Sequence, residues 1–423
     1  MADKAGSERD LSARRIIGFA CNQAFIFLSI LNAEGVGLPF EQHSLLWPPL
    51  FMAVGFAVLL LLSPASLNRL LSRPLLYLYV VCAGCGSLVP LFGYFSNPAG
   101  AIACGLLVGV PDALLLTAWG RSFDQGDSRD SVPEVFLGSL VAALLCLVFS
   151  VPELSAVVAG AVCLLPLAGV VNMDTSRNAS APASASPIGA NRSKVSSEEV
   201  APGARKSGKE SSAQAGKRSG GFFLSLDEMK GVVTTLSAKI LCGTFLFGVA
   251  AGLLMVSRAI SGLMTASDYR VSMVIYAAFV AGGLTLLLSD GFGRGAALNK
   301  SYRLAVFVMM MGVLLAPWPL FESSIMPGES VAVAGFLGLT VVLVSLFLVL
   351  AEIAGVDCAR SFSAGFLALS AGGLVGAAVA ALVGTAASSS PAPYVLTALA
   401  GAIILDNRIY RGKTGQPGAF GHM

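Results

Sequence analysis

Long apolar runs separated by short polar loops make up most of the chain. Six such runs precede one long polar stretch and six follow it. Each approaches the roughly 20 apolar residues that a helix needs to cross a hydrocarbon core about 30 Å thick. We therefore expect an all-α integral membrane protein with twelve spans, at 16–31, 45–62, 75–95, 99–119, 132–151, 154–171, 239–256, 271–288, 304–320, 331–351, 362–383 and 393–405.

The polar stretch, residues 172–221, divides the chain into two halves of similar length. It is rich in Ser, Ala, Gly, Pro, Lys and Arg and has almost no apolar pattern, which is typical of a disordered tether. The pattern predicts a terminal segment 1–13, a six-helix bundle at 14–171, the linker 172–221, a second six-helix bundle at 222–406 and a tail at 407–423. A short amphipathic segment, 222–230, leads into the second bundle.

Composition agrees with this picture. The chain of 423 residues is 55% hydrophobic and 12% charged, whereas about 25% charged residues is usual in soluble proteins. The net charge of +3 does not by itself indicate a nucleic-acid partner. Motifs for a P-loop, a HExxH zinc site and a GxSxG nucleophile are absent, and His43 and His422 are the two histidines. We expect that the protein is not an enzyme, that it binds no cofactor or metal ion, and that it does not contact nucleic acid directly.

The distribution of Lys and Arg predicts the orientation in a cell membrane. With both termini in the cytoplasm, the expected outer loops contain only Arg258 and Arg270, and the other basic residues fall on the inner side or in the linker. We expect a multi-pass protein of the inner, or cytoplasmic, membrane, with the lipid bilayer as its main partner.

A weak internal repeat supports two related halves. Arg121-Ser122-Phe123 follows the fourth apolar run, and Arg360-Ser361-Phe362 follows the tenth. We therefore expect Arg121 and Arg360 at equivalent positions, both at the cytoplasmic end of the fourth helix of their half. Asp124 and Asp357 are expected to be local partners of these arginines.

One loop carries a more specific motif. Asp290-Gly291-Phe292-Gly293-Arg294 lies between the eighth and ninth spans. This motif and the topology resemble the major facilitator superfamily, which implies two six-helix bundles around a central cavity. The resemblance implies that Asp290 and Arg294 form a charge relay at an inner gate, with Gly293 allowing a tight turn. In the first half the equivalent loop, 63–69, lacks the acid and both glycines.

A second resemblance is narrower. The opening of the first span, from Arg15 to Ala20, and the sequence from Trp119 to Phe123 look like the membrane half of actinobacterial LuxR-type regulators. Proteins of that class join a facilitator-like membrane domain to a helix-turn-helix. No DNA-binding module fits the tail at 407–423, so this resemblance implies either that the output domain has been lost or that the protein signals through a separate soluble partner.

Two amides lie about 11 Å into the first span, at 1.5 Å per residue. They are Asn22 and Gln23. By the facilitator resemblance the first helix of each half lines the cavity, which makes both residues candidates for hydrogen bonds to a small-molecule ligand. The alternative is a clamp between helices, which contributes about 0.6–2 kcal/mol.

Two acids are further candidates. Asp112 follows Pro111 inside the fourth span, far from any basic residue of its own helix, and could bind a coupling proton or a ligand. It could instead be paired with a cation on another helix or face a water-filled cavity. Glu352 lies eight residues before Arg360, and Asp112 lies nine before Arg121, so we expect the two acids at nearly the same depth. Its position near the end of a span makes Glu352 a gate or interface residue.

Two functions fit these patterns. The first is a secondary transporter that moves a small molecule by alternating access, as the two-bundle topology and Asp112 indicate. The second is a membrane-embedded sensor that binds a small molecule without moving it. The incomplete gate motif in the first half favours the sensor, and the absence of an output domain favours the transporter.

Overall fold

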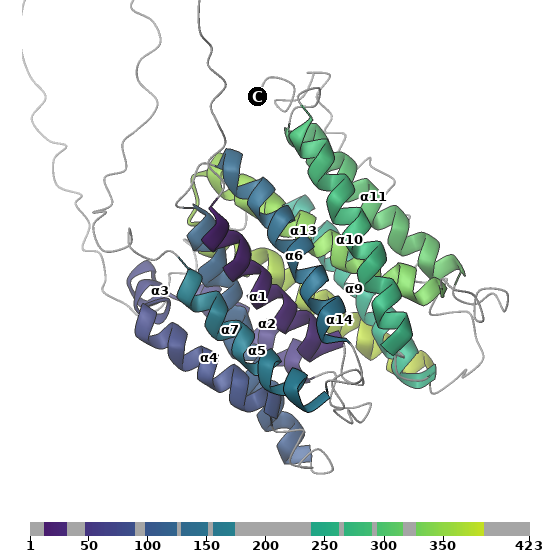
Figure 1. Ribbon diagram of the computed structural model, residues 1–423, viewed down its shortest axis with the longest axis horizontal. Helices are drawn as coiled ribbons and strands as arrows, with labels where there is room; N and C mark the ends of the chain where they lie inside the picture. The colour runs from purple at the N-terminus through teal and green to yellow at the C-terminus, as the bar shows by residue number, and fades with distance from the viewer. Residues whose placement is uncertain are drawn as a thin grey trace, which may run out of the picture.

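The structure is a computed structural model and describes residues 12–31, 47–88, 98–124, 128–150, 155–173, 238–261, 266–289, 294–315 and 327–384. Every regular element in these ranges is a helix (Figure 1). The N-terminal half contains α1 (Ala13–Leu31), α2 (Trp47–Leu61), α3 (Pro64–Leu70), α4 (Arg73–Leu88), α5 (Pro98–Asp124), α6 (Ser128–Phe149) and α7 (Ser155–Asn172). The C-terminal half contains α9 (Ala238–Ser261), α10 (Ala266–Leu288), α11 (Arg294–Leu315), α13 (Gly328–Ala354) and α14 (Cys358–Gly384).

The structure places helices at the predicted spans wherever the chain is described. Each of the first eleven expected spans coincides with one long helix. The twelfth span at 393–405, the linker at 172–221 and the amphipathic segment at 222–230 lie outside the described residues. Five described helices are each long and apolar enough to cross a membrane, namely α5, α6, α10, α13 and α14. The bent pair of α3 and α4 would make a sixth, and α2, α7 and α9 contain shorter apolar helices.

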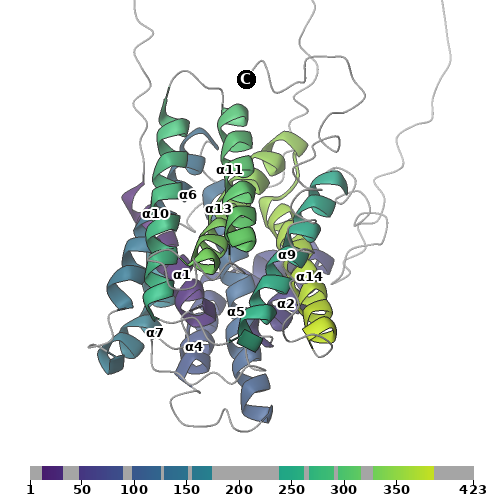
Figure 2. The ribbon, with the colours of Figure 1, turned by 90° about the vertical axis from the view of Figure 1, so that its right-hand side faces the viewer.

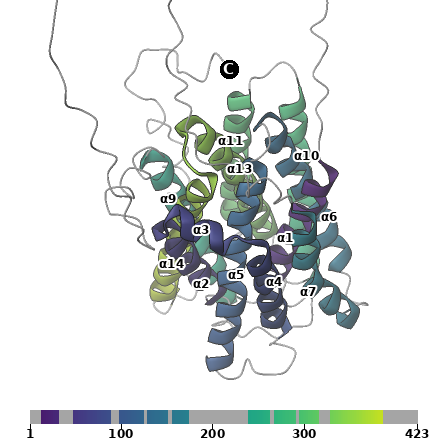
Figure 3. The same cartoon turned by 90° about the vertical axis from the view of Figure 1, so that its left-hand side faces the viewer.

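The short helix α3 is the one element that the apolar pattern did not predict. Ser63 caps its start, since the Ser63 hydroxyl accepts a hydrogen bond from the amide of Ser66. Pro64 occupies the first turn, where its missing N–H costs no hydrogen bond. The helix meets α4 at an angle of 58° and lies crosswise to the long helices (Figure 3). The loop that lacks the gate motif is therefore a folded element.

The same packing scheme occurs in both halves. In the N-terminal half the first span packs against the fifth (α1 and α6), the third against the fourth (α4 and α5) and the second against the fourth (α2 and α5). In the C-terminal half the corresponding pairs are α9 with α14, α11 with α13 and α10 with α13. Figure 2 shows α9 beside α14. This agreement reveals the two-fold repeat more clearly than the sequence does.

Helix α5 touches α13 and α14, and α6 touches α13, but two larger pairs of helices join the halves. They are α2 with α14 and α6 with α10, and they too correspond to each other when the halves are exchanged. On the first pair the rings of Phe56 and Phe366 stack with centroids 5.6 Å apart. The candidate residues Asn22, Gln23 and Asp112 lie on or beside these helices. The contacts between the halves therefore define where a functional site can lie.

Candidate functional site

A group of hydrogen bonds in the apolar interior connects the two halves. Ser139 of α6 donates its hydroxyl to Gln23 Oε1 at 2.8 Å, and Gln23 Nε2 donates to the hydroxyl oxygen of Tyr276 at 3.4 Å. All three side chains are buried. We call Gln23, Ser139 and Tyr276 the interior cluster. The first contact is within the N-terminal half, and the second, longer one crosses to α10.

The surroundings of the interior cluster are aromatic and uncharged. The ring of Phe27 meets the ring of Tyr276 edge to face, with centroids 5.6 Å apart. About two turns from Ser139 on α6, Cys146 lies next to Tyr269 of α10. Ser139 and Tyr276, like Cys146 and Tyr269, lie at matching levels of two antiparallel helices. Residues at such spacings share one helix face, so α6 and α10 meet through a continuous seam.

Asn22 faces a different neighbour. Its Cβ would lie 3.5 Å from a β-carbon added at Gly169 of α7, so it sits at the contact between α1 and α7. The side chain is 1% exposed, and Nδ2 has no hydrogen-bond partner among the described residues. Adjacent amides on one helix project about 100° apart. The two amide candidates are therefore separated, and Gln23 is the one that reaches the other half.

Asp112 is fully buried in the middle of α5. Neither carboxylate oxygen has a hydrogen-bond partner within the described part of the chain. The next residue, Ala113, packs against Gly55 of α2, and Trp119, two turns along the same face, covers Gly18 of α1. Asp112 therefore lies on the side of α5 that faces its own half. An ionised carboxylate there is costly, and a bound proton removes that cost.

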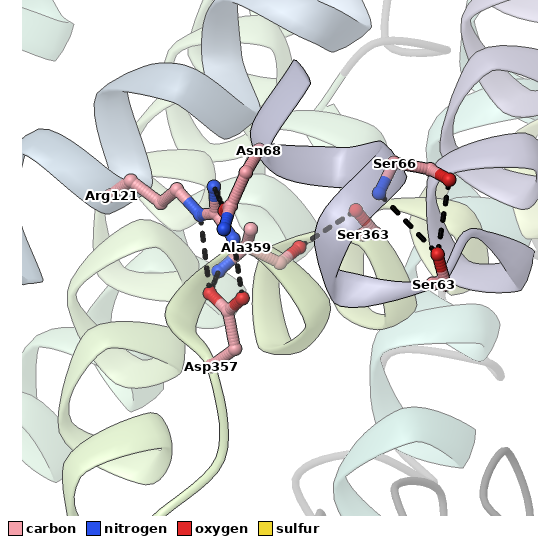
Figure 4. A network of polar contacts seen from close by, with 7 residues as sticks. All are labelled: Ser63, Ser66, Asn68, Arg121, Asp357, Ala359 and Ser363. Carbon is pink, nitrogen blue, oxygen red and sulfur yellow. Dashed lines mark hydrogen bonds and ion pairs between the residues drawn. The ribbon is translucent and has the colours of Figure 1, made fainter. Parts of the chain in front are cut away.

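An ion pair joins the two halves at one end of the helices (Figure 4). Arg121, in the last turn of α5, donates from Nη2 to Asp357 Oδ2 at 2.5 Å and from Nε to Asp357 Oδ1 at 3.3 Å. Its Nη1 also donates to Asn68 Oδ1 of α3 at 2.7 Å. We call Asn68, Arg121 and Asp357 the end cluster. Two parallel hydrogen bonds to a carboxylate give such a pair a defined geometry.

Asp357 has a second role at the start of α14. Its Oδ1 accepts a hydrogen bond from the amide of Ala359 at 3.0 Å. A side chain in this position satisfies one of the free N–H groups at a helix start. The same carboxylate thus caps a helix of one half and binds an arginine of the other, so a change in the spacing of the halves acts directly on α14.

The structure contradicts the predicted equivalence of Arg121 and Arg360. Arg121 lies in the last turn of α5, whereas α13 ends at Ala354 and Arg360 lies in the first turn of α14. The helix ends early because Gly355 adopts a left-handed conformation with φ of 62°, which closes the end of α13. The two copies of the Arg-Ser-Phe motif therefore occupy different positions in the two halves. The relation between the halves is seen in the helix packing and not in this motif.

The predicted match in depth between Asp112 and Glu352 is wrong for the same reason. Glu352 is an exposed residue in the last turn of α13, and Asp112 is buried at the centre of α5. The comparison assumed that Arg360 ended the helix that carries Glu352, which the turn at Gly355 excludes. Glu352 is therefore a helix-end residue, in keeping with its interpretation as a gate or interface residue.

The gate motif between the eighth and ninth spans cannot be placed. Asp290 and Gly293 lie outside the described residues, and of Arg294 the structure describes the backbone at the start of α11. Among the described residues, no group of three His, Cys, Asp or Glu side chains lies close enough together to hold a metal ion.

Sequence reasoning missed several residues of these clusters. Ser139 and Tyr276 are ordinary residues within apolar runs, and the sequence around Asn68 matches no known motif. Glu134 was also missed. It is fully buried on α6, and its Oε1 accepts hydrogen bonds from Arg15 Nη2 at 3.0 Å and from the amide of Ser12 at 2.7 Å. An acid near the start of a span was the one available signal for that contact.

Comparison with known proteins places this architecture. No protein-family model matches the chain, and no curated protein matches its sequence. Solved structures match over nearly the whole chain. The human organic anion transporter MFSD10 is 12% identical, with 93% of this chain and 96% of that chain covered and a TM-score of 0.52. The Escherichia coli fucose:proton symporter FucP is 13% identical, with 94% and 98% covered and a TM-score of 0.51.

A third similar structure is a bacterial homologue of the iron transporter ferroportin in an outward-facing state. It is 13% identical, with 94% of this chain and 96% of that chain covered and a TM-score of 0.51. FucP is described as a transporter of the Major Facilitator Superfamily. Identities this low show the fold alone. In its described residues the chain has the all-α, two-bundle membrane fold of these transporters.

Proposed function

We propose that this protein is a secondary transporter that moves a small molecule across the cell membrane by alternating access. The observation that carries the proposal is the interior cluster, in which Gln23 of the N-terminal half meets Tyr276 of the C-terminal half inside the apolar part of the fold. In such a fold the substrate binds near the bilayer midplane between the repeats. A hydrogen bond of 3.4 Å is long, so little is lost when the halves part and a ligand takes its place.

Alternating access also requires a contact between the halves that breaks during the transport cycle, and the end cluster can serve as that contact. Arg121 and Asp357 come from different halves and lie at helix ends. Both side chains keep some exposure, at 13% and 30%. Water can therefore solvate the charges when the pair separates, which keeps the energy cost of opening moderate. We place this end on the cytoplasmic side, since the positive-inside pattern assigns the ends of the fourth and tenth spans to the cytoplasm.

Asp112 supplies a site for the coupling proton. It is the buried carboxylate of α5 without a hydrogen-bond partner in the described chain. It lies within the N-terminal half, so a proton there need not compete directly with a ligand between the halves. Proton binding and helix movement are linked if one conformation hydrates this carboxylate and the other does not.

The sensor remains a second candidate because of one observation. The loop that would carry the gate motif in the N-terminal half forms α3, and Asn68 supplies an uncharged contact to Arg121. A sensor would bind its ligand and change shape, and would signal through a soluble partner without moving the ligand.

One experiment separates the two candidates. The full chain would be screened against organic acids, amines, sugars, nucleosides and aromatic alcohols for thermal stabilisation. Each stabilising compound would then be tested for uptake into proteoliposomes under an imposed pH gradient. Saturable uptake above protein-free liposomes supports the transporter. Stabilisation by a compound that is never taken up, in either gradient direction, would favour the sensor.

A further inference from the structure

Away from the end cluster, several of the groups that meet across the two halves are aromatic. Phe27 of α1 meets Tyr276 of α10, and Phe56 of α2 stacks on Phe366 of α14. The ring of Phe362 covers Gly120 of α5, where an added β-carbon would lie 2.9 Å from Cγ. A ligand that enters between the halves replaces some of these contacts. Flat apolar rings replace aromatic contacts best, because ring edges and faces attract each other.

Within the apolar ranges, the hydrogen-bonding groups that meet across this interface are neutral. Ser139 holds Gln23 Oε1, which directs the amide nitrogen of Gln23 towards α10. When the halves part, that nitrogen and the Tyr276 hydroxyl each lose one partner. Both groups can donate to a hydroxyl or carbonyl oxygen of a ligand. The amide orientation therefore selects a ligand with at least one uncharged acceptor.

Charges able to balance an ionic ligand are missing from the same region. None of the twelve apolar ranges contains Lys, Arg or His, apart from Lys239 at the first position of one range. Their two carboxylates, Asp112 and Glu134, both belong to the N-terminal half, and Glu134 is paired with Arg15. An ionic ligand would lose its hydration without gaining a counter-charge, which costs several kcal/mol.

Resting on the proposed function, we infer that the ligand is an uncharged molecule with a flat apolar ring and a hydroxyl or carbonyl group. Gln23 and Tyr276 determine this specificity through the amide nitrogen and the phenol. Phe27, whose ring meets that of Tyr276, supplies a surface for the ring. Organic anions and organic cations are poor ligands, since no described residue between the halves balances their charge within the apolar region.

Two sets of matched probes test the charge preference directly. The first is tryptophol, tryptamine and indole-3-acetate, which share a ring and are neutral, cationic and anionic at pH 7. The second is phenethyl alcohol, phenethylamine and phenylacetate. Binding of each to the full chain in lipid nanodiscs would be measured by thermal stabilisation and by equilibrium dialysis, with protein-free nanodiscs as the blank.

We expect at least one alcohol to bind at least about tenfold more tightly than its amine and acid counterparts. Tyr276→Phe keeps the ring and removes the hydroxyl, and Gln23→Leu removes the amide. Each should weaken alcohol binding by about fivefold to tenfold. The control is Ser345→Ala, because the buried Ser345 hydroxyl donates to Val341 of its own helix. This variant should bind the alcohol as the parent does.

The outcomes separate this inference from the proposed function. Tighter binding of an amine or an acid, or failure of both alcohols to bind, overturns the inference. Unchanged alcohol binding in both Gln23→Leu and Tyr276→Phe also overturns it. If an alcohol binds as expected but never enters proteoliposomes, the ligand class stands and transport fails. If a charged compound is taken up, transport stands and the ligand class fails.

Discussion

The guanidinium of Arg121 holds the carboxylate of Asp357 across the two halves, with Nη2 2.5 Å from Oδ2. Asp357 also accepts a hydrogen bond from the amide of Ala359 and so caps α14. The ion pair and the cap share one side chain. The strength of this contact can therefore be changed without unfolding the helix start, provided that the substitution keeps an oxygen in place.

Asp357→Asn is such a substitution. It removes the charge that binds Arg121 and leaves an amide oxygen that can cap α14. We expect the halves to separate more often at this end, and Cys358, which is fully buried beside Asp357, to become several-fold more reactive towards a maleimide. The measurement is the rate of modification of Cys358 by mass spectrometry. Arg121→Ala should act in the same direction. Equal rates in the parent and both variants would show that the pair does not hold this end closed.

Asp112→Asn tests the coupling proton. The amide is close in shape to a protonated carboxyl and cannot ionise, so we expect the folded protein to be at least as stable as the parent. Uptake driven by a pH gradient should be lost, and exchange of ligand without a gradient should persist. Thr117→Val, on the same helix, is the matched control, because the buried Thr117 hydroxyl donates to the carbonyl oxygen of Ala113 within α5. Gradient-driven uptake that survives in Asp112→Asn would remove Asp112 from the coupling step.

The helices of the described ranges were predictable because spans in lipid must satisfy a simple rule of length and apolar content. The pairing of Ser139 with Gln23 was not, since serine and glutamine occur in many apolar runs and only the packing decides which ones meet. Asp112 was found because a carboxylate in a span is rare. The equivalence of Arg121 and Arg360 failed because one left-handed glycine, Gly355, shifts the end of α13 by several residues relative to the motif.

Glu134→Gln tests the contact that fixes the start of the first span. Glu134 Oε1 binds both Arg15 and the amide of Ser12, and it is fully buried. The amide keeps one acceptor but loses the charge, so the free energy of unfolding should fall by about 1–3 kcal/mol. The midpoint of thermal unfolding in detergent measures the change.

Arg15→Gln and the double variant complete the cycle. If Arg15 and Glu134 interact with each other, the double variant should lose less free energy of unfolding than the sum of the losses in the two single variants. Additive effects would show that Glu134 acts on the Ser12 amide alone. Ligand binding should be unchanged in all three, because this contact lies within the N-terminal half.

The closest packing in the described chain joins α9 and α14. A β-carbon added at Gly252 would overlap the carbonyl oxygen of Gly373, and one added at Gly376 would overlap that of Val249. Backbones can approach this closely only where side chains are absent, as is common between helices in membranes. Gly252→Val should therefore force the two helices apart and cost more than about 3 kcal/mol.

The expected result for Gly252→Val is loss of the folded, monodisperse protein in detergent, measured by size-exclusion chromatography after matched expression. Gly160→Ala is the control, since a β-carbon there meets nothing within 4 Å. It should leave yield and thermal midpoint unchanged or slightly raised, because alanine favours the helix by about 1 kcal/mol over glycine. A stable Gly252→Val protein would mean that α9 and α14 can separate, and that the C-terminal half is more pliable than their contact implies.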